Sequence, residues 1–167
     1  IRDRARRSLE KGAVTENYGG SVEQTVELLN EALATEIVCW LRYRFHAVTA
    51  QGINSEAVKA EFDEHAQEEL EHANMIAARL PQLGDPPPFT HDGLTQRSSS
   101  QYVEGDSLVD MIEENLIAER IAIETYREMI RHFETHDSTT RRMLEEILAT
   151  EEEHAEDMHD LLVAHQG

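Results

Sequence analysis

Two copies of one short motif are the most informative feature of this sequence. The segment ELEHA at 69–73 returns, with one change, as EEEHA at 151–155. In each copy a glutamate is followed three residues later by a histidine, and this spacing places both side chains on one face of a helix. A carboxylate and an imidazole on the same face can hold the same metal ion. The repeat therefore predicts two pairs of metal ligands.

Four long helices would carry these pairs. Apolar residues recur at alternating spacings of three and four over about 21–50, 55–83, 107–135 and 138–165. Ser21 with Gln24 suits a helix start, and the proline run 86–88 prevents the second helix from continuing. Aromatic residues make up only 5% of the chain, whereas Ala, Glu and Leu are plentiful. The sequence predicts an all-α protein.

Each helix carries one glutamate in the middle of its apolar seam, and two of the helices add a histidine. No seam position offers a lysine or arginine. A buried, unpaired carboxylate costs on the order of several kcal/mol, so a purely structural polar core is disfavoured. Two divalent ions would balance the four negative charges. We therefore predict a dinuclear metal centre whose catalytic residues and metal ligands are the same six side chains: Glu36, Glu69, His72, Glu119, Glu151 and His154.

The ligand types limit the choice of metal. Carboxylate oxygens with one imidazole per ion suit iron or manganese, whereas structural zinc prefers thiolates. Iron(II) held in this way keeps open positions that dioxygen or peroxide can reach. We expect two iron ions per chain, with manganese or zinc as possible substitutes.

The two halves of the chain repeat each other beyond the ligands. Glu36 and Glu119 are each followed at plus seven by a Tyr-Arg pair, at Tyr43 and Tyr126. The halves predict a pseudo-two-fold centre, bridged either by Glu69 and Glu151 or by Glu36 and Glu119. The tyrosines would pack and hydrogen-bond to ligand carboxylates, or act as electron donors. Simpler interpretations apply to the remaining histidines and acidic residues. We expect His65 to be a core or channel histidine and Glu68 to be part of a solvated face. We expect surface positions for four histidines: His46, His132, His136 and His159.

A long connection separates the two predicted helical hairpins. Residues 84–105 hold prolines, glycines and a serine run, and show little helical periodicity. Two hairpins joined by one long crossover between helices 2 and 3 form a four-helix bundle. Residues 1–20 are basic at first and end in Gly19-Gly20, so we expect an N-terminal arm at 1–20 and one bundle domain at 21–167.

The net charge limits the kinds of molecule that the protein is expected to bind. With 34 acidic residues against 15 Lys and Arg, the formal charge is −19. Such a surface repels DNA and anionic membranes and attracts cations, although solubility alone would also account for it. Cys39 is the single cysteine, so no intrachain disulfide can form, and a reducing cytoplasmic location fits. The apolar run Ile37 to Leu41 is too short to span a membrane.

The six-ligand pattern resembles the di-iron carboxylate motif of the ferritin-like superfamily. The segment ATEIVCWLRYRFHA and the two Glu-x-x-His motifs are similar to those of bacterioferritins and of Dps-like mini-ferritins with a di-iron centre inside each subunit. This resemblance implies a ferroxidase that oxidises iron(II) with O2 or H2O2 and stores iron(III) in a hollow homo-oligomeric cage. It also favours Glu69 and Glu151 as the bridging pair.

Departures from these families refine the expectation. Leu70 stands where haem-binding bacterioferritins carry methionine, so we expect no haem. The short stretch after His154 lacks a fifth helix, which favours a 12-subunit cage over 24 subunits. Ile121 stands where archaeal Dps-like proteins carry a cysteine. A rubrerythrin-like di-iron peroxidase or oxidase without iron storage is the main alternative, and a DNA-compacting shell is the third.

Overall fold

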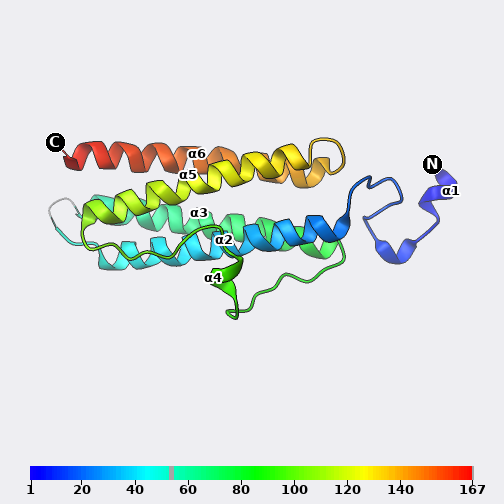
Figure 1. Ribbon diagram of the computed structural model, residues 1–167, viewed down its shortest axis with the longest axis horizontal. Coiled ribbons are helices and arrows are strands. Elements are labelled where there is room, and N and C mark those ends of the chain that lie inside the picture. Colours follow the sequence, from blue (N-terminus) through cyan, green and yellow to red (C-terminus); the bar gives the residue numbers. More distant parts are fainter. Residues whose placement is uncertain (53–54, 167) are drawn as a thin grey trace.

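The protein is a bundle of four long helices, seen in a computed structural model that describes residues 1–52 and 55–166 (Figure 1). The long helices are α2 (Val22–Thr49), α3 (Ser55–Gln82), α5 (Leu108–His132) and α6 (Ser138–Gln166). All regular elements in the described residues are helical. The predicted all-α four-helix bundle is confirmed. None of the described helices is long and apolar enough to span a membrane.

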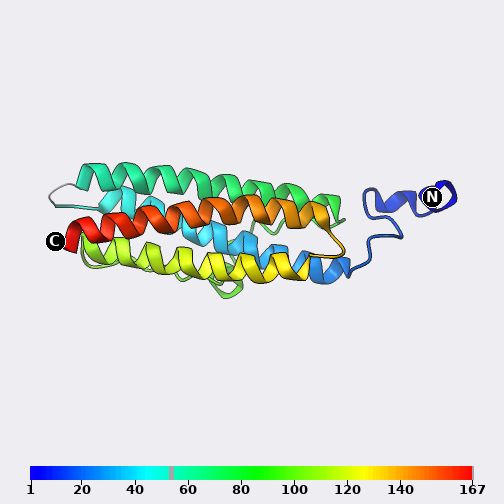
Figure 2. The ribbon, with the colours of Figure 1, turned by 90° about the horizontal axis from the view of Figure 1, so that it is seen from above.

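Two antiparallel hairpins build the bundle, and one long segment connects them. Helix α2 pairs with α3, and α5 pairs with α6 (Figures 1 and 2). The connection after α3 runs back along α2 and contains the short helix α4 (Leu94–Arg97), which packs against α2. It returns the chain to the end where α3 began, so α3 and α5 run in the same direction (Figure 1). This is the predicted crossover between the second and third long helices.

The helix ends follow from local sequence. The Ser21 hydroxyl accepts a hydrogen bond from the Gln24 backbone N–H at 3.2 Å, and Ser107 caps α5 through Asp110 in the same way. Beyond α3, Gly84 takes a left-handed conformation with φ +92°, and the Asp85 N–H donates to the Leu80 carbonyl. Helix α5 ends at His132, short of the predicted Thr135, because the turn at Phe133 leads into Asp137, which caps α6 through Thr140.

Residues before α2 extend past one end of the bundle. They contain a one-turn helix α1 (Arg2–Ala5) and a 3-10 turn η1 (Leu9–Lys11) (Figures 1 and 2). Val14 and Tyr18 pack against the bundle core, and the Tyr18 hydroxyl donates to Asp137 at 2.7 Å. The division into an arm at 1–20 and a bundle at 21–167 remains a prediction, and residue 167 lies outside the described residues.

The core is divided by a charged layer. One apolar cluster contains Leu33, Ile76 and Ile147, and the other contains Phe62, Ile112 and Met158. Each fully buried side chain of this size contributes about 1.5–3 kcal/mol. The predicted metal ligands lie between these clusters along the sequence of every long helix. The charged layer in the middle of the bundle is therefore flanked on each side by an apolar cluster.

The crossover is fastened to α2 by two buried polar residues. Arg42 donates from Nε to the Asn115 side chain at 2.8 Å and from Nη1 to the Ser100 hydroxyl at 2.9 Å. His46 is fully buried, lies 3.0 Å from the Glu104 carbonyl through Nε2, and receives an Asn115 N–H on Nδ1 at 2.9 Å. The interpretation of His46 as a surface residue is wrong, because the crossover covers this part of α2.

Candidate metal centre

The six predicted ligands meet in the middle of the bundle. Donor atoms of Glu36, Glu69, His72 and Glu151 all lie within 4.8 Å of one another, and so do those of Glu69, Glu119, Glu151 and His154. Each group takes two glutamates and one histidine from one hairpin and one glutamate from the other. Glu69 and Glu151 belong to both groups, and they are the pair predicted to bridge two ions. The four glutamates are at most 1% exposed.

The donor atoms of these residues are better arranged to bind cations than to form hydrogen bonds with one another. Within the described residues, both carboxylate oxygens of Glu69 and of Glu151, one oxygen of Glu119 and Nδ1 of His154 are buried without a hydrogen-bond partner. His72 Nδ1 lies 3.1 Å from Glu151, and His154 Nδ1 lies 3.6 Å from Glu69. Although the atoms of these two contacts are close, neither contact has hydrogen-bond geometry. Buried polar atoms of this kind are costly unless something binds them, so the six residues fit two metal ions.

Protons balance part of the charge when no metal is bound. Burial and the charges of Glu151 and Glu69 raise the pKa of Glu36 and of Glu119 well above the usual range. Burial opposes protonation of His154, but Glu151 and Glu69 outweigh it and raise its pKa to about 12. The pKa of His72 is raised in the same way by Glu151 and Glu36, also against burial. Metal ions entering the centre must displace these protons.

Two tyrosines connect the halves of the centre. The Tyr43 hydroxyl, from the first hairpin, donates to Glu119 of the second. The Tyr126 hydroxyl, from the second hairpin, donates to Glu36 of the first. Each tyrosine therefore orients the non-shared glutamate of the opposite half. This reciprocal arrangement agrees with the predicted pseudo-two-fold relation.

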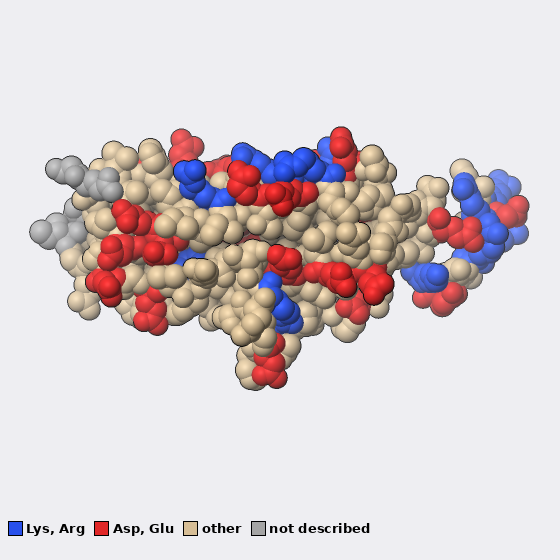
Figure 3. Space-filling view, in the orientation of Figure 1, with Lys and Arg blue, Asp and Glu red and all other residues tan. Residues whose placement is uncertain are grey.

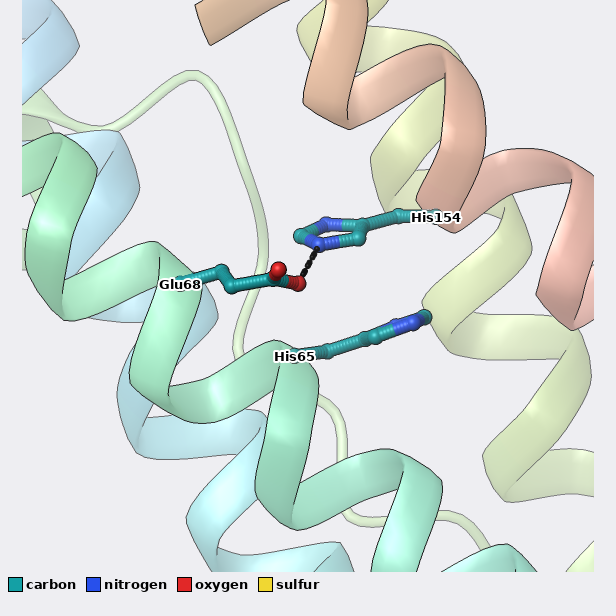
Figure 4. A group of neighbouring side chains, drawn as sticks. All are labelled: His65, Glu68 and His154. Atoms are coloured by element: carbon teal, nitrogen blue, oxygen red, sulfur yellow. Dashed lines mark hydrogen bonds and ion pairs between the residues drawn. The ribbon is translucent and has the colours of Figure 1, made fainter.

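Neighbouring side chains also hold the imidazole of His154 on the side that faces away from the centre. Its Nε2 lies 2.7 Å from Glu68, so an Nε2–H donating to that carboxylate leaves Nδ1 free to face the centre (Figure 4). The ring of His65 stacks on that of His154, with centroids 3.9 Å apart. Both Glu68 and His65 come from α3, whereas His154 comes from α6 (Figure 4). Glu68 is thus a hydrogen-bond partner of a predicted ligand and not simply part of a solvated face.

Comparison with known proteins agrees with this architecture. The model of the ferritin-like domain family matches residues 26–166, which include α3, α5, α6, all of α2 beyond its first turn, and all six predicted ligands. The chain belongs to the ferritin-like family. Its resemblance to Dps and bacterioferritin-related mini-ferritins is confirmed by similar solved structures.

Three relatives show the range of this similarity. The ferritin-like chain is 32% identical to the dodecameric thioferritin of Bacteroides fragilis, with a TM-score of 0.83 over 86% of this chain and 87% of that one. It is 30% identical to a nutrient stress-induced DNA-binding protein of Synechococcus sp., over 79% of this chain and 77% of the relative. A ferritin-like di-iron carboxylate protein of Bacillus anthracis is 25% identical, with a TM-score of 0.74 over 84% and 96% of the two chains.

Some residues around the centre of this ferritin-like protein escape sequence reasoning. Glu68 lies outside the apolar seam, and its spacing from His154 along the chain carries no signal. Arg42 and His46 look like solvent-exposed positions until the crossover is placed over them. The tyrosines could be found, because both recur seven residues after a seam glutamate.

Proposed function

We propose that the protein is a ferroxidase that stores iron in a homo-oligomeric cage of 12 chains. The observation that carries the proposal is the pair of four-residue ligand groups that share two buried glutamates. Such a centre holds two iron(II) ions close together, each with one imidazole and several carboxylate oxygens. The proposed ligands are Glu36, Glu69, His72, Glu119, Glu151 and His154.

The proposed reaction is the oxidation of the iron(II) ions that these residues can bind. Each of two substrate iron(II) ions loses one electron. The two electrons and two protons convert O2 to H2O2, or convert H2O2 to two water molecules. Carboxylates favour the product iron(III) because it carries the higher charge. Burial and the neighbouring carboxylates raise the pKa of Glu36 and of Glu119, which favours protonation in the metal-free centre, and iron binding would displace such protons.

The cage and its storage role rest on the relatives. The Bacteroides fragilis thioferritin is described as dodecameric, and it covers most of this chain. A store of oxidised iron limits the supply of iron(II) to peroxide, which protects a cell. The single, buried Cys39 suits the reducing cytoplasm. We place the protein there.

The test is an anaerobic titration of metal-free protein with iron(II), followed by air or peroxide and gel filtration. We expect two ions bound per chain before oxidant, and many iron atoms retained afterwards in a particle of about 12 chains. Retention of only two ions per chain by a monomer or dimer would instead support the rubrerythrin-like oxidase or peroxidase.

A matched pair of variants assigns the activity to the centre. His154→Ala removes a buried ligand from α6, whereas His159→Ala removes an exposed histidine from the same helix. The first change should abolish fast iron oxidation, and the second should leave the rate unchanged. Equal rates for the two variants would remove His154 from the site.

A further inference from the structure

A second group of metal-ligand residues lies beside the dinuclear centre. Glu61 and His65 lie one turn apart on α3, and Asp157 faces them from α6. Nε2 of His65 lies 3.4 Å from a Glu61 oxygen and 3.4 Å from an Asp157 oxygen. His65 is 2% exposed, whereas the carboxylates of Glu61 and Asp157 are 34% and 50% exposed. The three donors therefore meet where the bundle interior opens to solvent.

Hydrogen bonding decides which nitrogen of His65 carries the proton. The Tyr43 hydroxyl donates its hydrogen to Glu119, so its oxygen can only accept from His65 Nδ1, 3.2 Å away. A neutral imidazole has one N–H, which this contact uses. In this tautomer the lone pair of Nε2 points toward the two carboxylates, and the 3.4 Å contact between Nε2 and Asp157 has a hydrogen only when Asp157 is protonated. A cation bound between these three side chains would satisfy all of their donor atoms.

We propose that Glu61, His65 and Asp157 bind one divalent transition-metal ion, separate from the two in the dinuclear centre. Ligand atoms about 2.1 Å from an ion lie about 3.0–3.4 Å apart at octahedral or tetrahedral angles, which matches the observed spacing. One imidazole and two carboxylates suit iron(II), manganese(II) or zinc(II). Water fills the remaining positions, because both carboxylates are partly exposed.

This accessory site is connected to the dinuclear centre by hydrogen bonds. His65 donates to Tyr43, which donates to Glu119, a member of the second ligand group. An ion on Nε2 makes the opposite N–H of the ring a stronger donor. Binding at the accessory site therefore strengthens the hydrogen bond that orients Glu119. The accessory site does not depend on the proposed ferroxidase function, since metal binding alone defines it.

The test counts manganese(II) bound per chain by equilibrium dialysis of metal-free protein under argon. We expect wild type to bind one ion more than Asp157→Asn and one more than Glu61→Gln. Asp160→Asn, which changes an exposed aspartate on the same helix, should bind as many ions as wild type. Equal binding by wild type, Asp157→Asn and Glu61→Gln would overturn the accessory site.

A second measurement locates the ion directly. Crystals of wild type soaked in manganese(II) should show an anomalous difference peak between His65 Nε2, Glu61 and Asp157, and crystals of Asp157→Asn should not. A peak confined to the dinuclear centre would overturn the proposal and leave the ferroxidase intact. A one-ion difference in a protein that fails to oxidise iron would support the accessory site while refuting the ferroxidase.

Discussion

The four glutamates of the proposed dinuclear centre are unfavourable in the metal-free protein and favourable for the binding of metal ions. Without metal, Glu36, Glu69, Glu119 and Glu151 are buried together, and the structure accommodates them through shared protons and the two tyrosine hydroxyls. In the proposed metal-bound state, the same four side chains would attract the ions. The proposal therefore explains the four buried glutamates by metal binding and not by folding stability.

Replacing one of these carboxylates should separate the two effects. Glu36→Gln keeps the side-chain volume but removes a charge, so the metal-free protein should melt at the same temperature as wild type or higher. Iron oxidation should slow by about tenfold or more, because a ligand is lost. Calorimetry of the metal-free protein and stopped-flow absorbance of iron(III) formation measure the two quantities.

The exposed Glu27 on the same helix provides the control. Glu27→Gln should change neither the melting temperature nor the oxidation rate. A Glu36→Gln protein that oxidises iron at the wild-type rate would show that Glu36 is not a ligand.

At the scale of elements, the crossover is held by a buried polar network. The network consists of Arg42 and His46 on α2, Asn115 on α5, the Ser100 hydroxyl and the Glu104 carbonyl. Because Arg42 and His46 come about two and three turns after the predicted ligand Glu36, the network fixes the rotation of α2 in the bundle. Through that rotation the crossover helps to orient Glu36, a predicted ligand.

The network predicts a pH-dependent loss of stability. Burial and the nearby Arg42 lower the pKa of His46 to about 4, below its ordinary value of 6.5. The unfolded chain binds this proton more readily than the folded one, so His46 contributes stability above pH 6.5 that is lost as the pH falls toward 4. The loss should be on the order of 2–3 kcal/mol.

Urea unfolding of metal-free protein between pH 7 and pH 4 checks this expectation. His46→Gln should be less stable than wild type at pH 7 but should lose less stability over the same pH range. The matched variant His159→Gln, altered at an exposed position, should follow wild type. Parallel pH curves for wild type and His46→Gln would contradict the assignment.

At the scale of the whole molecule, charge is unevenly distributed. The chain carries a net charge of −19, yet Arg2, Arg4, Arg6, Arg7 and Lys11 gather at the N-terminal end, which extends past the bundle (Figure 3). Arg7 is already paired with Glu16 at 2.9 Å, and Asp3 and Glu10 lie within the same stretch. The basic cluster is therefore partly neutralised, and the acidic body lies directly behind it.

This distribution predicts that the chain does not retain DNA at physiological salt. Screening over about 8 Å weakens attraction by the arm, and the acidic body repels the phosphates. A band-shift assay with linear duplex DNA in 0.15 M salt should show no retarded species. Retarded DNA that disappears when residues 1–12 are deleted would contradict this prediction and favour the DNA-compacting shell.

Much of this protein follows from sequence periodicity alone. The three-and-four spacing of apolar residues determined four helices, and Ser21, Ser107 and Gly84 determined where three of their ends lie. The same periodicity identified the six candidate ligands, because a glutamate in an apolar seam must face the bundle interior. These features are local: they depend on residues within a few turns of one another.

The remaining features depend on how the helices are rotated and where the crossover runs. Only the tertiary structure decided that Tyr43 and Tyr126 reach across to the opposite halves, that Glu68 holds His154, and that Asp157 meets His65. It also decided that His46 is buried. Each of these contacts joins residues far apart in the chain, and the angle at which two helices meet is set by the packing of all their side chains together. Residue spacing along one helix does not specify which distant side chains meet at that angle.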